Sequence, residues 1–525
     1  MGDLFFFFPK YCNGEEMAKK ELMFELLKHS WLLIIPSILL LLLLSSRRRR
    51  QKLPPGPWQL PILGNIHQLG LIAHRSLLHL AEKHGPLMYL QLGRIPTIVV
   101  SSPDIASEIL KTLDLAFASR PSTSPSVAKF WYGGRMAKYD EHWRQIRKFG
   151  RLKIYNMKQV QSFRRVREDE VDVLIQTIRR SSSSPVNLRK LFVFMTNNIT
   201  SREAFGKRIS DDGECNWRPD HDLFKEILQL LGQFSIRQLL LPLEWLHKRS
   251  GLKEKLEKTF ERMDQLFERE IEKHCSCSNR DGDGDGDGDE DGKRDLLSVL
   301  LKYQADSNLG FSFTKDDVKA IIQGIFFGST DTTSSILEWL ISELIKNPRV
   351  MKKAQDEVRG VVGNKGKVEE SDLQQLQYLK LVINETLRLH PPGPLLAPRE
   401  CREECNVQGY KIPVGTMVIV NAWAIMRDPK LWENPDDFIP ERFDGVAMNY
   451  RGQHFQFIPF GAGRRMCPGM QLGIAIVEIT IANVLYHFNW ELPAGTDMDM
   501  TESMPLALRK KSPLILKATP RMALV

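Results

Sequence analysis

The fold of this chain is decided by the stretch Phe460-Gly-Ala-Gly-Arg-Arg-Met-Cys-Pro-Gly469, close to its C-terminus. A single cysteine, Cys467, lies between Gly463 and Gly469, and Arg465 precedes it by two residues. Because glycine has no Cβ, the backbone can turn here and approach a large flat ligand closely. Backbone N–H groups in such a turn can stabilise a thiolate, and an arginine can bind an acidic substituent of the ligand. The pattern favours a ligand-binding Cys467 over the alternative, a buried structural cysteine in a Gly-rich turn.

The spacing Phe-x-x-Gly-x-Arg-x-Cys-x-Gly resembles the haem-binding loop of cytochromes P450, and its positions are filled by Phe460, Gly463, Arg465, Cys467 and Gly469. The chain looks like the plant microsomal (A-type) members, which are haem-thiolate monooxygenases. The resemblance implies the cytochrome P450 fold, mainly α with a minor β lobe, preceded by an N-terminal membrane-anchor helix. It also implies haem b (iron protoporphyrin IX) as cofactor, with Cys467 as axial iron ligand, Phe460 beside the metal and Arg465 on a propionate.

A long helical pattern extends from Asp316 to Lys346 and stops at Asn347-Pro348. Inside it, the stretch Gly328-Ser-Thr-Asp-Thr-Thr333 brings together glycine and hydroxyl residues, which a helix interior normally avoids because they weaken it. We therefore expect a break in the helix here, with room for a bound diatomic molecule.

This stretch resembles the oxygen-activation motif of the same family. The resemblance implies that Asp331 and Thr332 relay protons, and that Gly328 and Ser329 belong to the substrate pocket. Ser329 stands where the family usually has glycine, so its hydroxymethyl group can narrow the oxygen groove or add a hydrogen bond. A structural alternative stays open, in which the threonines only hydrogen-bond within their own helix.

Three further residues match propionate ligands of the family. Trp143 and Arg147 are four residues apart, so a helix places them on one face, and Arg399 follows a proline in a later segment. Taken alone, the first pair fits an amphipathic surface helix better, but the presence of the cysteine loop favours the propionate role. Basic residues surround the pair and are expected to form a docking patch for an acidic reductase: Arg144, Lys148, Arg151 and Lys153.

A charged cluster is expected near the haem. Glu385 and Arg388 are three residues apart in a helical pattern, and Arg442 lies in Pro440-Glu-Arg-Phe443. They match the buried Glu–Arg–Arg cluster of the family, and buried charges are tolerated when mutually paired. The resemblance therefore gives these three a structural role. It also places two turns in the substrate pocket, represented by Leu395, Leu396, Met504 and Pro505, although such apolar residues equally fit ordinary core.

The N-terminal region predicts a membrane anchor. Residues 31–44 are almost wholly apolar, and Arg47 to Arg50 follow. A cleaved signal peptide is the rival interpretation, but basic residues after the apolar run favour a retained anchor with the following chain in the cytosol. We expect a lumenal extension or an overlong start (residues 1–22), the anchor (23–46), a basic stop and Pro-rich hinge (47–57) and a catalytic domain (58–525). The Asp-Gly repeats at 281–292 predict a disordered loop inside that domain.

Composition narrows the classes of function. The 525 residues carry 73 basic and 64 acidic side chains, a net charge of +9, and five of the positive charges lie at positions 47–52. Without an interleaved basic and aromatic stripe, this balance argues against nucleic-acid binding. The seven cysteines, an odd number in a long chain, favour a reducing compartment.

The combined prediction is a monooxygenase that inserts one oxygen atom from O2 into a hydrophobic plant specialised metabolite, a terpenoid or a phenolic compound. Electrons would come from NADPH through NADPH–cytochrome P450 reductase. The protein would be held by membrane lipid in the endoplasmic reticulum as a single-pass protein whose catalytic domain faces the cytosol. Two alternatives stay open: a reductase-independent haem-thiolate isomerase or dehydratase, and a non-catalytic haem-binding protein.

Overall fold

The computed structural model describes residues 53–121, 138–181, 184–208, 251–278, 295–306, 310–504 and 507–521, with Leu223, Glu226, Ile227 and Leu230. The chain divides into two compact units, Met1–Pro54 and Pro55–Val525. The helices and strands of the described residues belong to the second unit. The predicted extension, the predicted anchor, most of the basic stop and the Asp-Gly loop lie outside the described residues.

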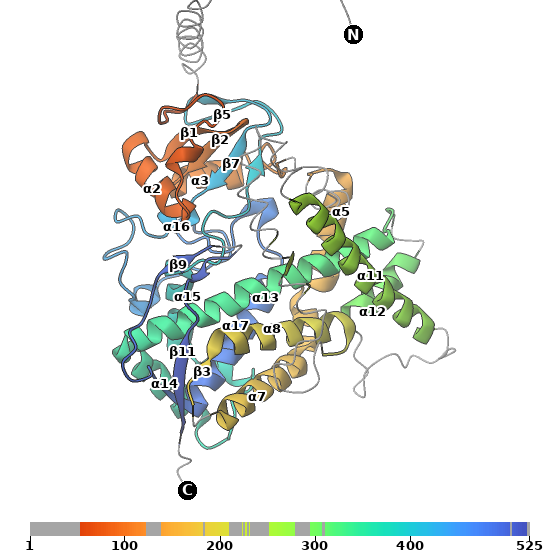
Figure 1. The fold of residues 1–525 in the computed structure, drawn as a ribbon, viewed down its shortest axis with the longest axis vertical. Coiled ribbons are helices and arrows are strands. Elements are labelled where there is room, and N and C mark those ends of the chain that lie inside the picture. The colour runs from red at the N-terminus through yellow and green to blue at the C-terminus, as the bar shows by residue number, and fades with distance from the viewer. Residues whose placement is uncertain are drawn as a thin grey trace, which may run out of the picture. The chain divides into compact units, whose positions relative to one another are not determined.

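The described chain is mainly helical, as expected from the sequence (Figure 1). The α-helices are α2 (Ala73–His84), α3 (Pro103–Ser107), α5 (Glu141–Phe149), α6 (Met157–Ser162), α7 (Arg164–Arg180), α8 (Leu188–Phe205), α11 (Leu252–Ser278), α12 (Leu296–Ala305), α13 (Lys315–Lys346), α14 (Pro348–Val362), α15 (Gln377–Leu389), α16 (Ala422–Ile425) and α17 (Met470–His487). Short 3-10 helices are η2 (Ile66–Gln68), η6 (Asp372–Gln375), η7 (Pro440–Phe443) and η8 (Gly463–Arg465), and η3 (Glu108–Thr112) and η4 (Gly150–Ile154) are π-helical.

The strands form small sheets. The largest has the order β1 (Leu87–Leu92), β2 (Ile95–Val100), β7 (Met417–Val420) and β4 (Arg399–Glu400). β1 and β2 form an antiparallel hairpin, and β7 runs parallel to β2. The other sheets are β3 (Val186–Asn187), β11 (Ile515–Pro520) and β8 (Phe488–Glu491); β10 (Arg509–Lys510) with β9 (Glu502–Ser503); and β5 (Cys405–Val407) with β6 (Tyr410–Ile412).

Helix α13 is the longest described helix and packs against α8, α15 and α17 (Figure 1). It begins with a capping box, in which Thr314 and Asp317 satisfy each other's backbone N–H groups. It ends at Lys346 before Asn347 and Pro348, as predicted. The expected break at residues 328–333 is wrong, because α13 is continuous through them. Packing against the neighbouring helices offsets the weak helix propensity of these residues.

Helix α17 carries the cysteine loop at its N-terminus. Among the described residues it alone has the length and apolar composition to cross a membrane. However, 72% of it is buried inside the protein, in the same core as α13 and α15. Its apolar character is therefore explained by the core.

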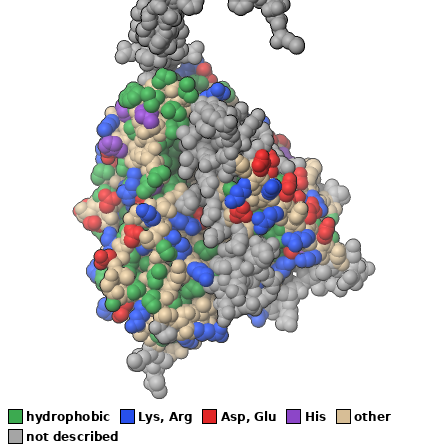
Figure 2. All heavy atoms as spheres, in the orientation of Figure 1, with side chains coloured by type: hydrophobic (Ala, Val, Ile, Leu, Met, Phe, Trp, Pro, Cys, Tyr) green, Lys and Arg blue, Asp and Glu red, His purple; other side chains and the backbone are tan. Residues whose placement is uncertain are grey.

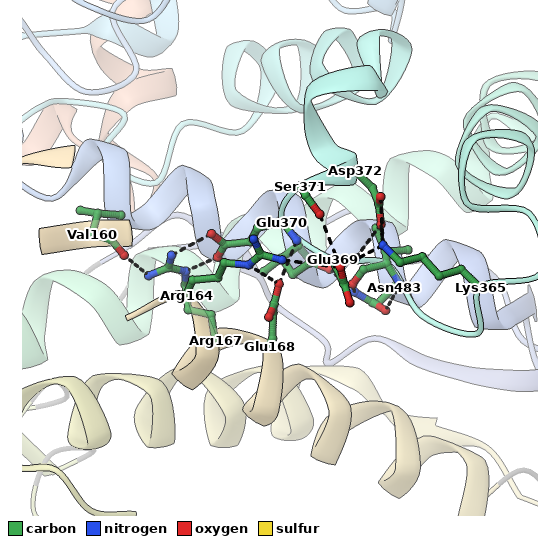
Figure 3. Close-up of polar contacts among 12 residues, drawn as sticks. Val160, Arg164, Arg167, Glu168, Lys365, Glu369, Glu370, Ser371, Asp372 and Asn483 are labelled. Carbon is green, nitrogen blue, oxygen red and sulfur yellow. Dashed lines mark hydrogen bonds and ion pairs between the residues drawn. The ribbon is translucent and has the colours of Figure 1, made fainter. Parts of the chain in front are cut away.

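A buried ionic network ties α7 to the connection between α14 and α15 (Figure 3). The Arg167 guanidinium is fully buried and donates to both oxygens of Glu370, at 2.6 and 3.0 Å, and to the Val160 carbonyl at 2.8 Å. The Glu203 carboxylate lies 3.5 Å from the same guanidinium, and burial raises its pKa to about 7. Such a network fixes the two segments because each buried charge is paired. On the molecular face in Figure 2, by contrast, acidic and basic side chains are interspersed.

Candidate functional site

The cysteine loop is held in place by backbone contacts. Gly463 has φ +71°, and a Cβ there would stand 2.2 Å from the Leu110 carbonyl oxygen, so only glycine fits. The Cys467 N–H donates to the Phe460 carbonyl at 3.0 Å. At Gly469, by contrast, an added Cβ would meet nothing within 4 Å. Thus one motif glycine permits close packing on η3 and the other leaves open space next to the cysteine.

The Cys467 thiol faces an internal cavity. The thiol is exposed to the cavity but lies deep within the protein. This burial raises the pKa of the Cys467 thiol. A hydrogen bond from the Gly469 backbone N–H and the positive charge of Arg147 act in the opposite direction. The sulfur also lies just before the N-terminus of α17, where the helix dipole favours negative charge. This environment suits a thiolate that a metal ion keeps deprotonated.

The cavity has a volume of about 420 Å³ and lies between α13 and the cysteine loop. Most of its lining is apolar or glycine, including Ile325, Ile336, Ile383, Leu387, Leu472 and Val477. Gly324 and Gly328 line it from α13, one helical turn apart, and an added Cβ at either would meet nothing within 4 Å. The α13 face opposite Cys467 is therefore open, which suits a flat ligand. A second cavity of about 780 Å³ shares Gly324 and Cys467.

Among the arginines that line these cavities, four have a lowered pKa. Burial, followed by the charges of the other arginines, lowers the pKa of Arg120 and of Arg465 to about 9. Burial also lowers the pKa of Arg147 and Arg399. The Asp114 carboxylate accepts a hydrogen bond of 2.6 Å from Arg399, but one carboxylate does not balance the positive charge of these four guanidinium groups. A cluster of this kind is suited to a ligand with two carboxylates, such as the propionates of a porphyrin.

Each guanidinium of this cluster is anchored to the backbone. Arg465 donates to the Ala118 carbonyl at 2.7 Å and lies over the Trp143 ring, 3.9 Å from its centroid. Arg147 donates to the carbonyl of Met466, next to the cysteine. Arg399 donates to the Ala462 carbonyl at 2.7 Å, and Arg120 donates to the Ala397 and Pro398 carbonyls at 2.5 and 2.7 Å. The guanidinium groups are thus oriented by the fold.

The structure brings most of the expected site residues together. Those lining the 420 Å³ cavity are Gly328, Ser329, Thr332, Leu396, Arg399, Phe460, Arg465 and Cys467, and Trp143 and Arg147 line the adjoining cavity. Leu395 instead packs against the core beside the β1–β2 hairpin. Met504 is half-buried and is not among the residues that line the 420 Å³ cavity. Pro505 lies outside the described residues. Leu395 and Leu396 differ because neighbouring residues in a turn point in different directions, which the sequence alone did not resolve.

Asp331 does not line either cavity. Its carboxylate is buried, forms an ion pair with Arg509 and accepts a hydrogen bond from the Ala507 N–H at 3.2 Å. Thr332 lines the cavity, and its hydroxyl donates to the Gly328 carbonyl at 2.5 Å, one turn back in α13. The back-bonding alternative therefore describes the Thr332 hydroxyl here, although the side chain also faces the cavity.

Glu385, Arg388 and Arg442 lie together in one hydrogen-bonded cluster. Arg388 donates to both carboxylate oxygens of Glu385 at 2.7 and 2.8 Å, and Arg442 donates to the same carboxylate at 3.0 Å. Glu385 and Arg388 are fully buried. Because Arg388 also donates to the Met426, Pro435 and Asp437 carbonyls, the cluster ties α15 to the segment before the cysteine loop.

Three residues around the cavities were not predicted as site residues from the sequence: Arg120, Asp114 and Tyr155. Arg120 precedes a proline, as Arg399 follows one, but a lone Arg-Pro pair is too common to be a signal. Asp114 accepts from the Arg464 backbone N–H at 2.8 Å and thereby supports the cysteine loop. Tyr155 lines both cavities, and burial raises its pKa. No spacing rule links these positions to Cys467, because they meet only in the fold.

Comparison with known proteins agrees with this geometry. A family model described as cytochrome P450 matches residues 54–518. Cytochrome P450 71A9 of Glycine max is 45% identical over 473 residues, which is 89% of this chain and 93% of that protein. Premnaspirodiene oxygenase of Hyoscyamus muticus is 43% identical, covering 90% and 93% respectively. Among solved structures, a zebrafish cytochrome P450 with abiraterone matches with a TM-score of 0.72 over 86% of this chain and 100% of that one, at 24% identity.

Proposed function

Since this chain belongs to the cytochrome P450 family of haem-thiolate monooxygenases, we propose that it oxygenates a hydrophobic plant specialised metabolite with electrons that a reductase delivers from NADPH. The observation that carries this proposal is the arrangement around one cavity: a cysteine thiol, a cluster of arginines, and an open glycine face on α13. The thiolate of Cys467 would hold the haem iron, and Arg120, Arg147, Arg399 and Arg465 would bind the propionates. When bound, the haem supplies O2 activation, to which a thiolate ligand contributes electron density.

The residues of this chain would bind the substrate and control water and protons. The apolar side chains of the cavity, such as Ile325, Ile336 and Leu396, would bind a hydrophobic molecule and exclude water. Thr332 would hold a proton at its hydroxyl next to the bound ligand. Asp331, whose side chain does not line the cavities, would support proton delivery. For this, its ion pair with Arg509 would have to open.

The electron donor is proposed from surface charge. Arg144, Lys148, Arg151 and Lys153 are exposed on α5 and η4, close to the segment that also supplies Trp143 and Arg147. A basic patch next to the residues that would hold the haem suits an acidic partner such as NADPH–cytochrome P450 reductase. We further propose that residues 23–46 anchor the protein in the lipid of the endoplasmic reticulum with the catalytic domain in the cytosol, on the apolar run and the arginines that follow it.

The test is expression of the full chain in microsomes with a plant NADPH–cytochrome P450 reductase, followed by a screen of terpenoid and phenolic compounds. We expect certain compounds to shift the haem Soret band and to increase NADPH consumption, with a product heavier by one oxygen atom. If compounds bind but no oxygen from labelled O2 enters any product, the monooxygenase assignment is contradicted.

A reductase-independent isomerase or dehydratase is a second candidate. It is favoured by the ion pair between Asp331 and Arg509, because an acid held by an arginine is less available for proton delivery. Turnover of a peroxide or an oxygenated substrate in microsomes that lack the reductase would establish it. No turnover under those conditions, with turnover once the reductase is added, would exclude it.

A further inference from the structure

Two adjacent hydroxyl residues connect α13 to α8 beside the cavity. The Ser329 Oγ lies 2.7 Å from the Thr200 Oγ1, and the Thr330 Oγ1 donates to the Asn197 Oδ1 at 2.8 Å. Thr200 and Asn197 are buried in α8, with 1% and 4% of their surface exposed. Ser329 differs from Thr330 because it also lines the cavity.

The direction of the Ser329 bond follows from counting protons. The Thr200 hydroxyl has one proton, which it donates to the Thr196 carbonyl at 2.8 Å within α8. Thr200 must then accept, so the Ser329 hydroxyl donates. The Ser329 proton therefore points toward α8 and away from the cavity.

The position of Ser329 gives this bond a consequence for the cavity. Its neighbour Gly328 faces open space, and the next turn presents Thr332 to the same cavity. A glycine at position 329 would provide no hydroxyl, so the link to Thr200 depends on the serine of this chain. Without the link, the cavity-facing turn of α13 would lose a side-chain contact with α8 where helix propensity is low.

We propose that Ser329 is a positioning residue, which ties the cavity wall of α13 to α8 through Thr200 and does not supply protons to the ligand. The inference rests on the proposed function, since it assumes that the haem and its small ligands occupy this cavity. It predicts that removing either hydroxyl loosens the same turn. Both removals should change access of small molecules to the metal in the same way.

The experiment uses the full chain in microsomes, with carbon monoxide as the probe. The rate of carbon monoxide rebinding to the reduced haem after a light flash is measured for Ser329→Ala, Thr200→Val and the double variant. We expect each single variant to change the rebinding rate about two- to tenfold, which corresponds to the net free energy of one hydrogen bond. The double variant should change the rate no further. Thr200→Ser, which keeps the acceptor, should behave as wild type. Thr177→Val serves as a control, because the Thr177 hydroxyl donates to the Val173 carbonyl within α7.

Other outcomes overturn the proposal. Rebinding rates equal to wild type in both single variants, or effects that add in the double variant, would show that the bond does not position α13. If Ser329 were a proton donor, Ser329→Ala would raise the hydrogen peroxide released per NADPH, whereas Thr200→Val would not. Should Thr200→Val fail to bind haem, Ser329→Gly carries the same expectation. A failure of the proposed function can be distinguished from a failure of this inference, because carbon monoxide rebinding requires neither reductase nor substrate.

Discussion

Arg388 provides the strongest test of how the fold supports the haem site. Its guanidinium is fully buried and donates to both oxygens of Glu385 and to three main-chain carbonyls in the segment 426–437. In Arg388→Met the apolar stem is largely kept, but all five hydrogen bonds are lost. The Glu385 carboxylate would retain the Arg442 guanidinium and the Ile439 N–H as donors.

The expected cost is large because the remaining charge cannot reach water. Removing one partner of a buried ion pair destabilises a protein by about 3–5 kcal/mol. Each carbonyl left without a donor adds up to about 1–3 kcal/mol, in part overlapping with the first figure. Since domains are stable by only about 5–15 kcal/mol, Arg388→Met should remove much of the stability of the folded unit.

The measurement is the thermal midpoint of the purified haem-loaded protein, followed by tryptophan fluorescence and by the Soret band. With an unfolding entropy near ~1 kcal/mol/K for a unit of this size, we expect the midpoint to fall by at least about 3–5 °C. Lys352→Met is the matched control, since Lys352 pairs with Asp356 on the surface of α14, where both are exposed. A midpoint for Arg388→Met within the scatter of this control would refute the reasoning.

Three further changes test other parts of the site. Gly463→Ala should strongly reduce the folded, haem-containing fraction, measured as Soret absorbance per protein, because the new Cβ would clash with the Leu110 carbonyl; normal loading contradicts this. Asp114→Asn should weaken haem binding about two- to tenfold, because both Asp114 oxygens accept hydrogen bonds that position Arg399 and the cysteine loop, and the amide nitrogen of asparagine cannot accept; unchanged affinity in haem titrations contradicts it. His487 has a pKa lowered to about 4 by burial and neighbouring arginines, below the value near 6.5 expected when unfolded. Its contribution is therefore present above about pH 6.5 and lost as pH falls toward 4. In His487→Asn, the thermal midpoint should depend less on pH between about 4 and 6.5 than it does in wild type. An unchanged pH dependence would exclude His487 as its cause.

Much of the architecture could be predicted because local signals coincide with long-range packing. The bounds of α13 and the Glu385–Arg388–Arg442 cluster both follow from short motifs. A motif is informative when several of its residues must meet one physical requirement together. The cysteine loop is the clearest case, since Gly463 is required by backbone packing and Gly469 borders the cavity beside Cys467.

The rest depends on contacts between distant segments. The pairing of Asp331 with Arg509 joins residues 178 positions apart, and neither sequence neighbourhood indicates it. The expected break in α13 was wrong for a similar reason, because packing on α8 keeps a weak helical sequence helical. Arg120 was missed because its charge matters only through its position among other arginines. The Ser329 bond likewise required Thr200, which the helix pattern of α8 does not single out.

The central claim is that the Cys467 sulfur holds the haem iron, and the most direct measurement is the absorbance of the reduced protein with carbon monoxide. We expect a band near ~450 nm in wild type, since a thiolate ligand donates electron density to the metal. The band should persist in Cys275→Ser, which changes an exposed cysteine, and should disappear in Cys467→Ser. A folded Cys467→Ser protein that keeps the band, or a folded wild type that lacks it, would contradict the account.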